Sequence, residues 1–327
     1  MRFHIAHADR VNRLSGSSHL PDVDCVVVNR DGGDALFRAL ASLESQTGVT
    51  LSAVVVDNGS QAAERARLSR ERPATRVIAF SRNLGFAGAA NEGIARTRAP
   101  FILLLNNDAV LEPDCVALLA ARLALDPRVA AVQGLVLSAD GRRVDTAGLQ
   151  WNGRGEAVPV LSGADAASAP REPFEVSGVS ATATLYRREA LEAVALQGAA
   201  FEGSFFAYYE DVDLSLRLSR AGWRFLCDPR AVARHEGSLT GRRTPFRKAL
   251  WTARNRWRTL FRNFAPALLA RNLGPLLAAD LAHARQVGWR GLALPLLVWP
   301  RLPGLALRSR AAPRLLSRFP GSGKSAP

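Results

Sequence analysis

The chain has 327 residues, of which 48% are hydrophobic, and its formal net charge is +14. This composition excludes a disordered chain, because it supplies enough apolar surface for a packed core. It contains no run of 18 apolar residues, so we expect no transmembrane helix, and the start MRFHIAHADR lacks the apolar segment of a signal peptide. Cys25, Cys115 and Cys227 show no pairing rhythm, which favours free thiols in a reducing cytoplasm over a disulfide framework.

The first third of the chain alternates between apolar runs and segments with helical patterns. The runs predict buried strands at residues 21–29, 51–60, 76–83 and 101–108. The segments between them predict helices at residues 34–46, 61–72 and 89–98. Such alternation is typical of an α/β fold with a mostly parallel sheet and right-handed crossovers.

Each of these four strands ends in Asn or Asp. In open α/β sheets, ligands bind at the carboxyl ends of the strands. We therefore expect a ligand site along one edge of the sheet, formed by Asn29, Asp57, Asn83 and Asp108.

The fourth strand runs directly into Asn106-Asn107-Asp108. Oxygen ligands favour a hard cation such as Mg²⁺ or Mn²⁺, which typically bridges a protein to a diphosphate. The triplet by itself favours an ordinary strand-to-turn exit, because Asn and Asp are turn residues. Its place beside the other strand ends favours a metal-nucleotide site.

The second half predicts a strand at residues 175–186, a helix at 187–194, and a further helix that continues to Gly222. Four aromatic residues (Phe205, Phe206, Tyr208 and Tyr209) precede Glu210, Asp211 and Asp213 in the first turn of this helix. Carboxylates there could simply complement the helix N-terminus. They could also form a general base that faces a carbohydrate, with a pKa raised by burial. His235, after a strand and turn at 223–233, is either a structural residue or a metal ligand.

The positive charge is concentrated at the C-terminal end. Residues 234–327 hold 18 Lys and Arg against Glu236 and Asp280, so this part has a net charge of +16 and the rest a net charge of −2. Trp251 and Trp257 alternate with arginines in residues 242–263. This pattern favours a membrane interface over plain packing against the body or binding to nucleic acid.

Six segments in this order resemble the family 2 inverting glycosyltransferases, particularly the bacterial rhamnosyltransferase-like group. They are VVVN at 26–29, VVDNGS at 55–60, RNLGFAGAANEG at 82–93, LLLNNDA at 103–109, FFAYYEDVDLSLRLSRAGW at 205–223, and His235. Together they cover roughly residues 22–260, and six weak matches in a fixed order make a specific one.

The resemblance implies a GT-A fold, which is a Rossmann-like, mostly parallel sheet flanked by helices. It also implies a nucleoside-diphosphate sugar as donor and a divalent metal, Mg²⁺ or Mn²⁺. The residues it assigns to nucleotide binding are Asn29, Asp57, Asn83, Gly85, Asn91 and Asn107. The metal would be held by Asp108, with His235 and Asn106; Asn106 stands where the family motif has Asp. Asp211 would be the general base, with Glu210 beside it.

The function implied by the resemblance is transfer of a sugar, rhamnose being one example, to a hydroxyl of a glycan or lipid-linked acceptor in cell-surface polysaccharide synthesis. We predict a flexible tail at residues 1–20, a GT-A domain at 21–241 and a basic, amphipathic helical extension at 242–327. That extension would hold the protein on the anionic inner face of the cytoplasmic membrane, and we expect no nucleic-acid partner. Oligomeric state, the sugar and the nucleotide base stay open.

The alternatives are another metal-dependent nucleotide-binding enzyme, such as a nucleotidyltransferase, and a non-catalytic glycosyltransferase-like protein. A Rossmann dehydrogenase is disfavoured because no G-x-G-x-x-G follows the first strand. GSGKS at 321–325 is not a P-loop, because Arg318 occupies the position of the first glycine and no strand precedes it.

Overall fold

The computed structural model describes residues 22–152, 154–237, 245–286, 288, 291, 293–308 and 316–320. The predicted tail at 1–20, the predicted domain boundary at 241–242 and the GSGKS segment lie outside these residues.

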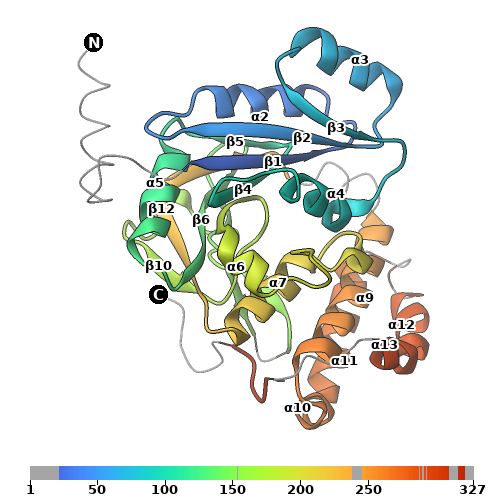
Figure 1. Cartoon of the computed structure of the whole chain (residues 1–327). Coiled ribbons are helices and arrows are strands. Elements are labelled where there is room, and N and C mark those ends of the chain that lie inside the picture. Colours follow the sequence, from blue (N-terminus) through green and yellow to red (C-terminus); the bar gives the residue numbers. More distant parts are fainter. Residues whose placement is uncertain are drawn as a thin grey trace.

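A large, mixed but mostly parallel sheet forms the centre of the molecule (Figure 1). Its parallel half contains β1 (Val23–Asn29), β2 (Leu51–Asn58), β3 (Arg76–Phe80) and β4 (Phe101–Asn106) in the order β4-β1-β2-β3. β1 pairs in parallel with both β2 and β4, and β2 pairs in parallel with β3. These strands confirm the first four predicted from the sequence, each with the polar end at the same edge.

The helices between these strands are α2 (Asp34–Glu44), α3 (Ala62–Glu71) and α4 (Gly85–Ile94). The first two agree with the predicted ranges to within two residues. Helix α4 begins at Gly85, four residues before the predicted start at Ala89. The φ of Gly85 is +78°. A glycine adopts this backbone conformation without the steric cost that other residues incur.

The other half of the sheet continues as β11-β6-β12-β10. These strands are β6 (Val129–Ser138), β10 (Phe174–Val176), β11 (Ala183–Arg187) and β12 (Arg224–His235). β6 and β12 are parallel, whereas β11 is antiparallel to both β4 and β6. The short strands β5 (Ala109–Leu111) and β7 (Val144–Thr146) pair with β12 and β6, and β8 (Leu149–Trp151) and β9 (Ala157–Pro159) form a separate hairpin.

The single strand predicted at 175–186 is wrong. This segment forms β10 and β11, which lie in the same sheet but are separated there by β12 and β6. Residues 177–182 cross between the two positions, and along the way the N–H of Ser180 donates to Gln133 Oε1. The apolar pattern of the segment is that of a strand throughout, but its pairing partners change in the middle.

Two hydrophobic cores cover the two faces of the sheet. One packs α2 and α5 (Cys115–Leu125) against inward residues such as Val27 and Leu103. The other packs α4, α6 (Arg188–Ala193) and α7 (Glu210–Arg220) against residues such as Val26 and Leu104. Neighbouring strand residues thus point to opposite faces, and both faces are buried, as expected for a parallel sheet.

A third core joins the C-terminal helices to the body. These helices are α9 (Pro245–Asn263), α10 (Pro266–Arg271), α11 (Leu273–Gln286), α12 (Ala293–Val298) and α13 (Leu302–Arg308). Leu216 of α7 and Trp151 of β8 share this core with Trp257 and Leu276 of the C-terminal helices. In Figure 1 these helices, in orange and red, lie beside α7 on one side of the sheet. Within the part of the chain that the structure describes, no helix is both long and apolar enough to span a membrane.

Candidate active site

The ends of β1 and β2 form a buried polar pair. Asn29 and Asp57 are neighbours in the β1–β2 register, and each is only 1% exposed. Oδ1 of Asp57 accepts a hydrogen bond of 2.8 Å from the N–H of Ser60, while its Oδ2 is buried and has no hydrogen-bond partner. A buried carboxylate oxygen without a donor is costly, so this atom is suited to accept a hydrogen bond from a ligand.

The loop after β3 is held to the end of β2 by a side chain that the sequence analysis did not select. Asn58 donates from Nδ2 to Asn83 Oδ1 (2.9 Å) and to the carbonyl of Gly85 (3.1 Å). Its own Oδ1 accepts from the N–H of Leu84 at 2.7 Å. Asn83 thus lies at the edge expected from the sequence, and its Oδ1 is already used to shape the start of α4.

Gly85 and Asn91 connect α4 to the loop that precedes α7. A Cβ atom added at Gly85 would lie 2.3 Å from the carbonyl oxygen of Phe206, so only glycine fits there. Asn91 exchanges two hydrogen bonds with the backbone of Phe201, one of 2.8 Å from its Nδ2 and one of 2.9 Å to its Oδ1. These contacts give both residues a structural task; a direct contact with the nucleotide stays a prediction.

The Asn106-Asn107-Asp108 triplet follows β4 as expected. Asn107 donates from Nδ2 to Asn29 Oδ1 at 2.8 Å, which joins the triplet to the end of β1. Asp108 is 5% exposed, and its carbonyl accepts a hydrogen bond from the N–H of Glu236. The triplet therefore lies between the end of β1 and the end of β12.

Asp108 and His235, 127 positions apart in the sequence, meet because β5 pairs with β12. His235 Nε2 lies 3.1 Å from Asp108 Oδ1, and His235 Nδ1 lies 2.7 Å from Asp145 Oδ2 on β7. Burial lowers the pKa of His235, but the two carboxylates outweigh it and raise the pKa to about 9. Asp108 and Asp145 therefore favour a positive charge at the position of the His235 imidazole. Nothing in the sequence around Asp145 had pointed to it.

The donor set of this cluster fits a divalent cation. Two ligands at right angles around an ion, each about 2.1 Å away, lie about 3 Å apart, close to the 3.1 Å between Asp108 Oδ1 and His235 Nε2. A histidine that binds a metal almost always donates its other ring N–H to a carboxylate, the position that Asp145 holds. Among the described residues no group of three or more His, Cys, Asp or Glu could hold a metal, so further ligands would come from a diphosphate and water.

Glu210 and Asp211 begin α7, as predicted. Glu210 is 7% exposed, and its Oε2 is buried without a hydrogen-bond partner. Burial raises the pKa of both carboxyl groups, and the neighbouring Asp211 charge raises that of Glu210 further. Backbone N–H groups of Val212 and Ala181 oppose the rise at Asp211. A proton on Glu210 leaves Asp211 as a carboxylate with increased basicity, which is what a general base requires.

The segment just before β11 lies between the start of α7 and the end of β4. The backbone of Ala181 lies close enough to Asp211 to lower the pKa of that carboxyl group. The next residue, Thr182, accepts a hydrogen bond of 2.9 Å from the N–H of Asn106. Residues 181 and 182 thus border both Asp211 and the strand end that carries the Asn106-Asn107-Asp108 triplet.

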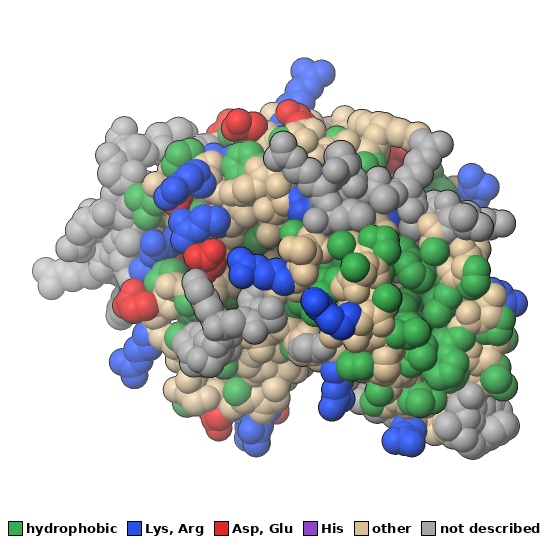
Figure 2. Space-filling view, turned by 90° about the horizontal axis from the view of Figure 1, so that it is seen from below, with side chains coloured by type: hydrophobic (Ala, Val, Ile, Leu, Met, Phe, Trp, Pro, Cys, Tyr) green, Lys and Arg blue, Asp and Glu red, His purple; other side chains and the backbone are tan. Residues whose placement is uncertain are grey.

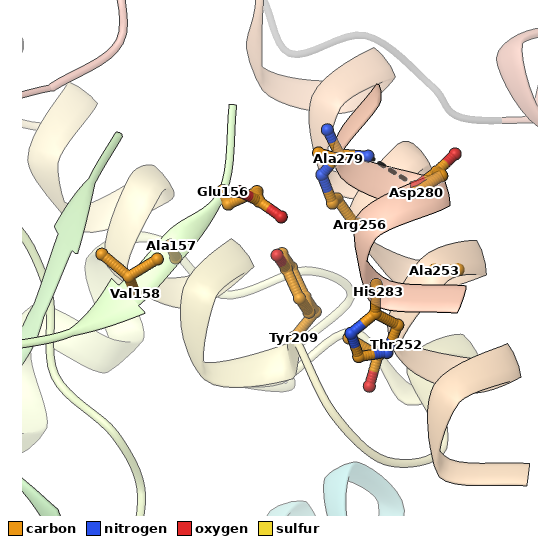
Figure 3. Close-up of a pocket in the computed structure, with 10 residues that line it drawn as sticks. All are labelled: Glu156, Ala157, Val158, Tyr209, Thr252, Ala253, Arg256, Ala279, Asp280 and His283. Atoms are coloured by element: carbon orange, nitrogen blue, oxygen red, sulfur yellow. Dashed lines mark hydrogen bonds and ion pairs between the residues drawn. The ribbon is translucent and has the colours of Figure 1, made fainter. Parts of the chain in front are cut away.

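A cavity of about 160 Å³, lined in part by Tyr209, lies between the β8–β9 hairpin and helices α9 and α11 (Figure 3). Arg256 and Asp280 in its wall are bonded to each other at 2.8 Å. The second oxygen of Asp280 accepts from the indole N–H groups of Trp257 and Trp299. These buried charges are satisfied within the protein, and they join α9 to α11.

A mostly parallel sheet with this topology, covered by helices on both faces, is the architecture of the GT-A fold. The chain belongs to glycosyl transferase family 2, whose model matches residues 24–195. It is a glycosyltransferase with a GT-A fold.

Two curated proteins are among its relatives. The succinoglycan biosynthesis protein ExoO of Rhizobium meliloti is 38% identical over 125 residues, which are 38% of this chain and 36% of that protein. The N-acetylglucosaminyl-diphospho-decaprenol L-rhamnosyltransferase of Mycobacterium tuberculosis is 28% identical over 246 residues, which are 66% of this chain and 77% of that protein. The match to the Rhizobium protein thus spans about a third of its length.

The fold also resembles that of solved structures. The crystal structure of GalNAc-T7 with UDP, GalNAc and Mn²⁺ has a TM-score of 0.58 and 14% sequence identity, over 88% of this chain and 58% of the other. At this identity the likeness describes the fold alone.

Proposed function

We propose that this protein is an inverting glycosyltransferase that moves a sugar from a nucleoside-diphosphate sugar to a hydroxyl of a glycan or lipid-linked acceptor. The observation that carries the proposal is the contact of 3.1 Å between Asp108 and His235 after β4, in a chain whose helix α7 begins with Glu210 and Asp211. A displacement with a diphosphate leaving group requires a general base and a positive charge for the leaving group, and these two clusters would supply them. Family membership favours this reaction over a nucleotidyltransferase.

In the proposed reaction, Asp211 takes the proton of the acceptor hydroxyl while that oxygen attacks the anomeric carbon. The bond between that carbon and the diphosphate oxygen breaks, and the nucleoside diphosphate leaves with the electron pair. Because there is one displacement, the configuration at the anomeric carbon inverts. Protonated Glu210 keeps a second negative charge away from Asp211.

On the donor side, Oδ2 of Asp57 has no hydrogen-bond partner and lies 3.9 Å from Arg65 Nε, so it would accept a hydrogen bond from the nucleoside base. Asn29 and Asn107, which are hydrogen-bonded to each other, would lie between the nucleoside base and the diphosphate of the donor. A divalent ion held by Asp108 and His235, with Asn106 beside them, would supply positive charge to the diphosphate. His235 would bind through Nε2, because its Nδ1 faces Asp145.

The relatives support a role in polysaccharide assembly. One is named for succinoglycan biosynthesis and the other for rhamnose transfer to a diphospho-decaprenol acceptor. We therefore propose a rhamnose donor and a lipid-linked glycan acceptor as the first pair to test.

A thermal-shift screen tests the function. The full-length protein is mixed with nucleotide sugars, including dTDP-rhamnose, UDP- and GDP-sugars, with and without Mn²⁺. We expect stabilisation by a nucleotide sugar that increases with Mn²⁺, because a ligand that binds only the folded state stabilises it. Stabilisation by none of them would contradict the proposal.

We also propose that the C-terminal helices bind an anionic membrane surface, though with a different face from the one the sequence favours. On α9, Trp257 is 1% and Arg256 3% exposed, whereas Trp251 is half-buried. The large exposed apolar residues of the C-terminal part are Leu273, Leu281 and Leu296.

Figure 2 shows hydrophobic side chains gathered on the side that carries these helices, with Lys and Arg near them. Three arginines of this part of the chain are also exposed: Arg271 at the end of α10, Arg285 on α11 and Arg301 in the turn between α12 and α13. Leucines among arginines suit the interface between headgroups and acyl chains. This surface would place the site near a lipid-linked acceptor on the cytoplasmic face.

A further inference from the structure

The segment before the catalytic pair has a strained backbone. In residues 205–209, the aromatic loop, three non-glycine residues have positive φ: Phe206 at 67°, Tyr208 at 68° and Tyr209 at 71°. Residues other than glycine pay a steric cost in this region, and such strain persists only where the surroundings hold it. Some part of the structure must therefore hold the loop.

The side chain of Asn255, on α9, makes that contact. It is fully buried, and its Nδ2 donates to the carbonyls of Phe205 (2.8 Å), Ala207 (2.9 Å) and Tyr208 (2.8 Å). An amide has two N–H groups, so three carbonyls share them. A single side chain of a C-terminal helix thus holds the backbone of most of the aromatic loop.

The aromatic loop lies between the donor side of the site and the catalytic pair. On one side the N–H of Ala87, in α4, donates to the carbonyl of Phe206 at 3.3 Å. On the other side the N–H of Asp213 donates to the carbonyl of Tyr209 at 2.9 Å, which closes the first turn of α7 around Glu210 and Asp211. A shift of the loop backbone would therefore move the start of α7, which carries Asp211.

We propose that Asn255 is a positioning residue, which holds the aromatic loop in its strained form and thereby aims Asp211 at the acceptor hydroxyl. The inference rests on the proposed role of Asp211. It makes α9, which lies beyond the residues matched by the family model, a part of the catalytic machinery.

The test uses Asn255→Ala and Asn255→Asp in the full-length protein. The first removes the three hydrogen bonds. Asn255→Asp keeps the size of the side chain, but a carboxylate oxygen then faces the backbone carbonyl oxygens of the aromatic loop and repels them. Release of nucleoside diphosphate from the donor found in the screen gives kcat, and titration with UDP and Mn²⁺ gives nucleotide affinity. We expect kcat to fall by about 10–100-fold, since small displacements of a catalytic group have effects of this order, and nucleotide affinity to change by less than about twofold.

Trp257→Phe is the matched control. It removes a buried hydrogen bond from another residue of α9, the one from the indole N–H to Asp280, and leaves the hydrogen bonds of Asn255 to the aromatic loop in place. We expect it to lower the melting temperature without a comparable fall in kcat. If Trp257→Phe and Asn255→Ala reduce kcat equally, the effect belongs to general weakening of α9 and the proposal is wrong.

Trp251 reports on the loop independently of activity. Its ring centroid lies 5.0 Å from that of Phe206 and 6.5 Å from that of Tyr208. Asn255→Ala should change the tryptophan fluorescence of the native protein, and the change should vanish in a Trp251→Phe background. An unchanged spectrum would overturn the proposal.

Asp211→Asn separates this inference from the proposed function. If Asp211→Asn is inactive and Asn255→Ala is normal, the inference fails and the function stands. If Asp211→Asn keeps normal turnover, Asp211 is not the base and the inference fails with that assignment, whereas the proposed transfer reaction still stands.

Discussion

The backbone N–H of Asn106 donates a 2.9 Å hydrogen bond to the carbonyl of Thr182. Asn106 ends the central strand β4, and Thr182 comes just before β11, which is antiparallel to it. Since the backbone of the preceding residue, Ala181, lies beside Asp211, this contact ties the segment next to the proposed base to the strand that leads to the proposed metal ligands. Sites built on strands hold their geometry better than sites on loops.

Asp108→Ala should abolish the divalent-dependent part of UDP or dTDP binding, because it removes the charged ligand at the end of β4. His235→Ala should weaken binding less, since a neutral ligand is lost. Calorimetric titration with and without Mn²⁺ measures both effects. Glu112→Ala is the control: it removes a half-exposed carboxylate just after β5 that pairs with Arg234 and leaves the cluster intact. If nucleotide binding by Asp108→Ala depends on Mn²⁺ as much as in the native protein, the assignment of Asp108 as a metal ligand is wrong.

Asp145→Ala should weaken Mn²⁺ binding by about 10–100-fold, the usual effect of losing the carboxylate behind a metal-binding histidine. The 2.7 Å contact with His235 Nδ1 favours the tautomer with Nε2 free for the metal. Asp145→Asn, which keeps an oxygen acceptor, should lose less. Electron paramagnetic resonance of free Mn²⁺ gives the affinities. Equal binding by the native protein and Asp145→Ala would show that the carboxylate does not orient the imidazole.

Asp211→Asn should lower turnover by about 10²–10⁴-fold, because the amide keeps the size but cannot accept the proton. Donor affinity should barely change, since Asp211 acts on the acceptor. Single-turnover rates and nucleotide titrations separate the two quantities. If turnover stays near normal, the base lies elsewhere, and Glu210 or Asp213 becomes the next candidate.

Glu210→Gln should stabilise the fold increasingly as the pH rises. The folded protein raises the pKa of Glu210 above its usual 4.5, mainly by burial. Folding therefore favours the protonated form, and the native protein loses stability as the pH increases above 4.5. Glutamine carries no such cost. Melting temperatures of the native protein and of Glu210→Gln between pH 4 and 8.5 check this. If the variant's advantage in melting temperature shrinks as the pH rises, the prediction is wrong.

Replacing Leu273, Leu281 and Leu296 together by Glu should reduce binding to liposomes that contain anionic lipid. All three leucines are exposed, with Leu296 at 75%, so the change leaves the core in place. Each new charge both removes apolar area and repels anionic headgroups. Flotation at low and high salt measures the effect, and an unchanged melting temperature verifies the fold. Full-length protein that ignores anionic liposomes would contradict the membrane proposal itself.

The local sequence pattern was sufficient to predict a strand or helix where that element depends only on its own residues. The strands at 23–29, 51–58, 76–80 and 101–106 follow from apolar runs that end in polar residues. The start of α7 follows from its acidic first turn and its end from Gly222. The pattern failed at 175–186, where one apolar segment serves two places in the sheet, because pairing partners come from distant residues.

The sequence by itself determined the α/β class, the family resemblance and the identity of the polar strand ends, because burial of apolar runs and turn chemistry are local properties. Only the tertiary structure decided which distant groups meet. Asp145 reaches His235 through β7, and Asn255 reaches the aromatic loop from α9. It also decided that Trp257 and Arg256 are internal. Arginines alternating with tryptophans are equally compatible with a lipid surface and with a buried ion pair, and only packing against Asp280 distinguishes the two.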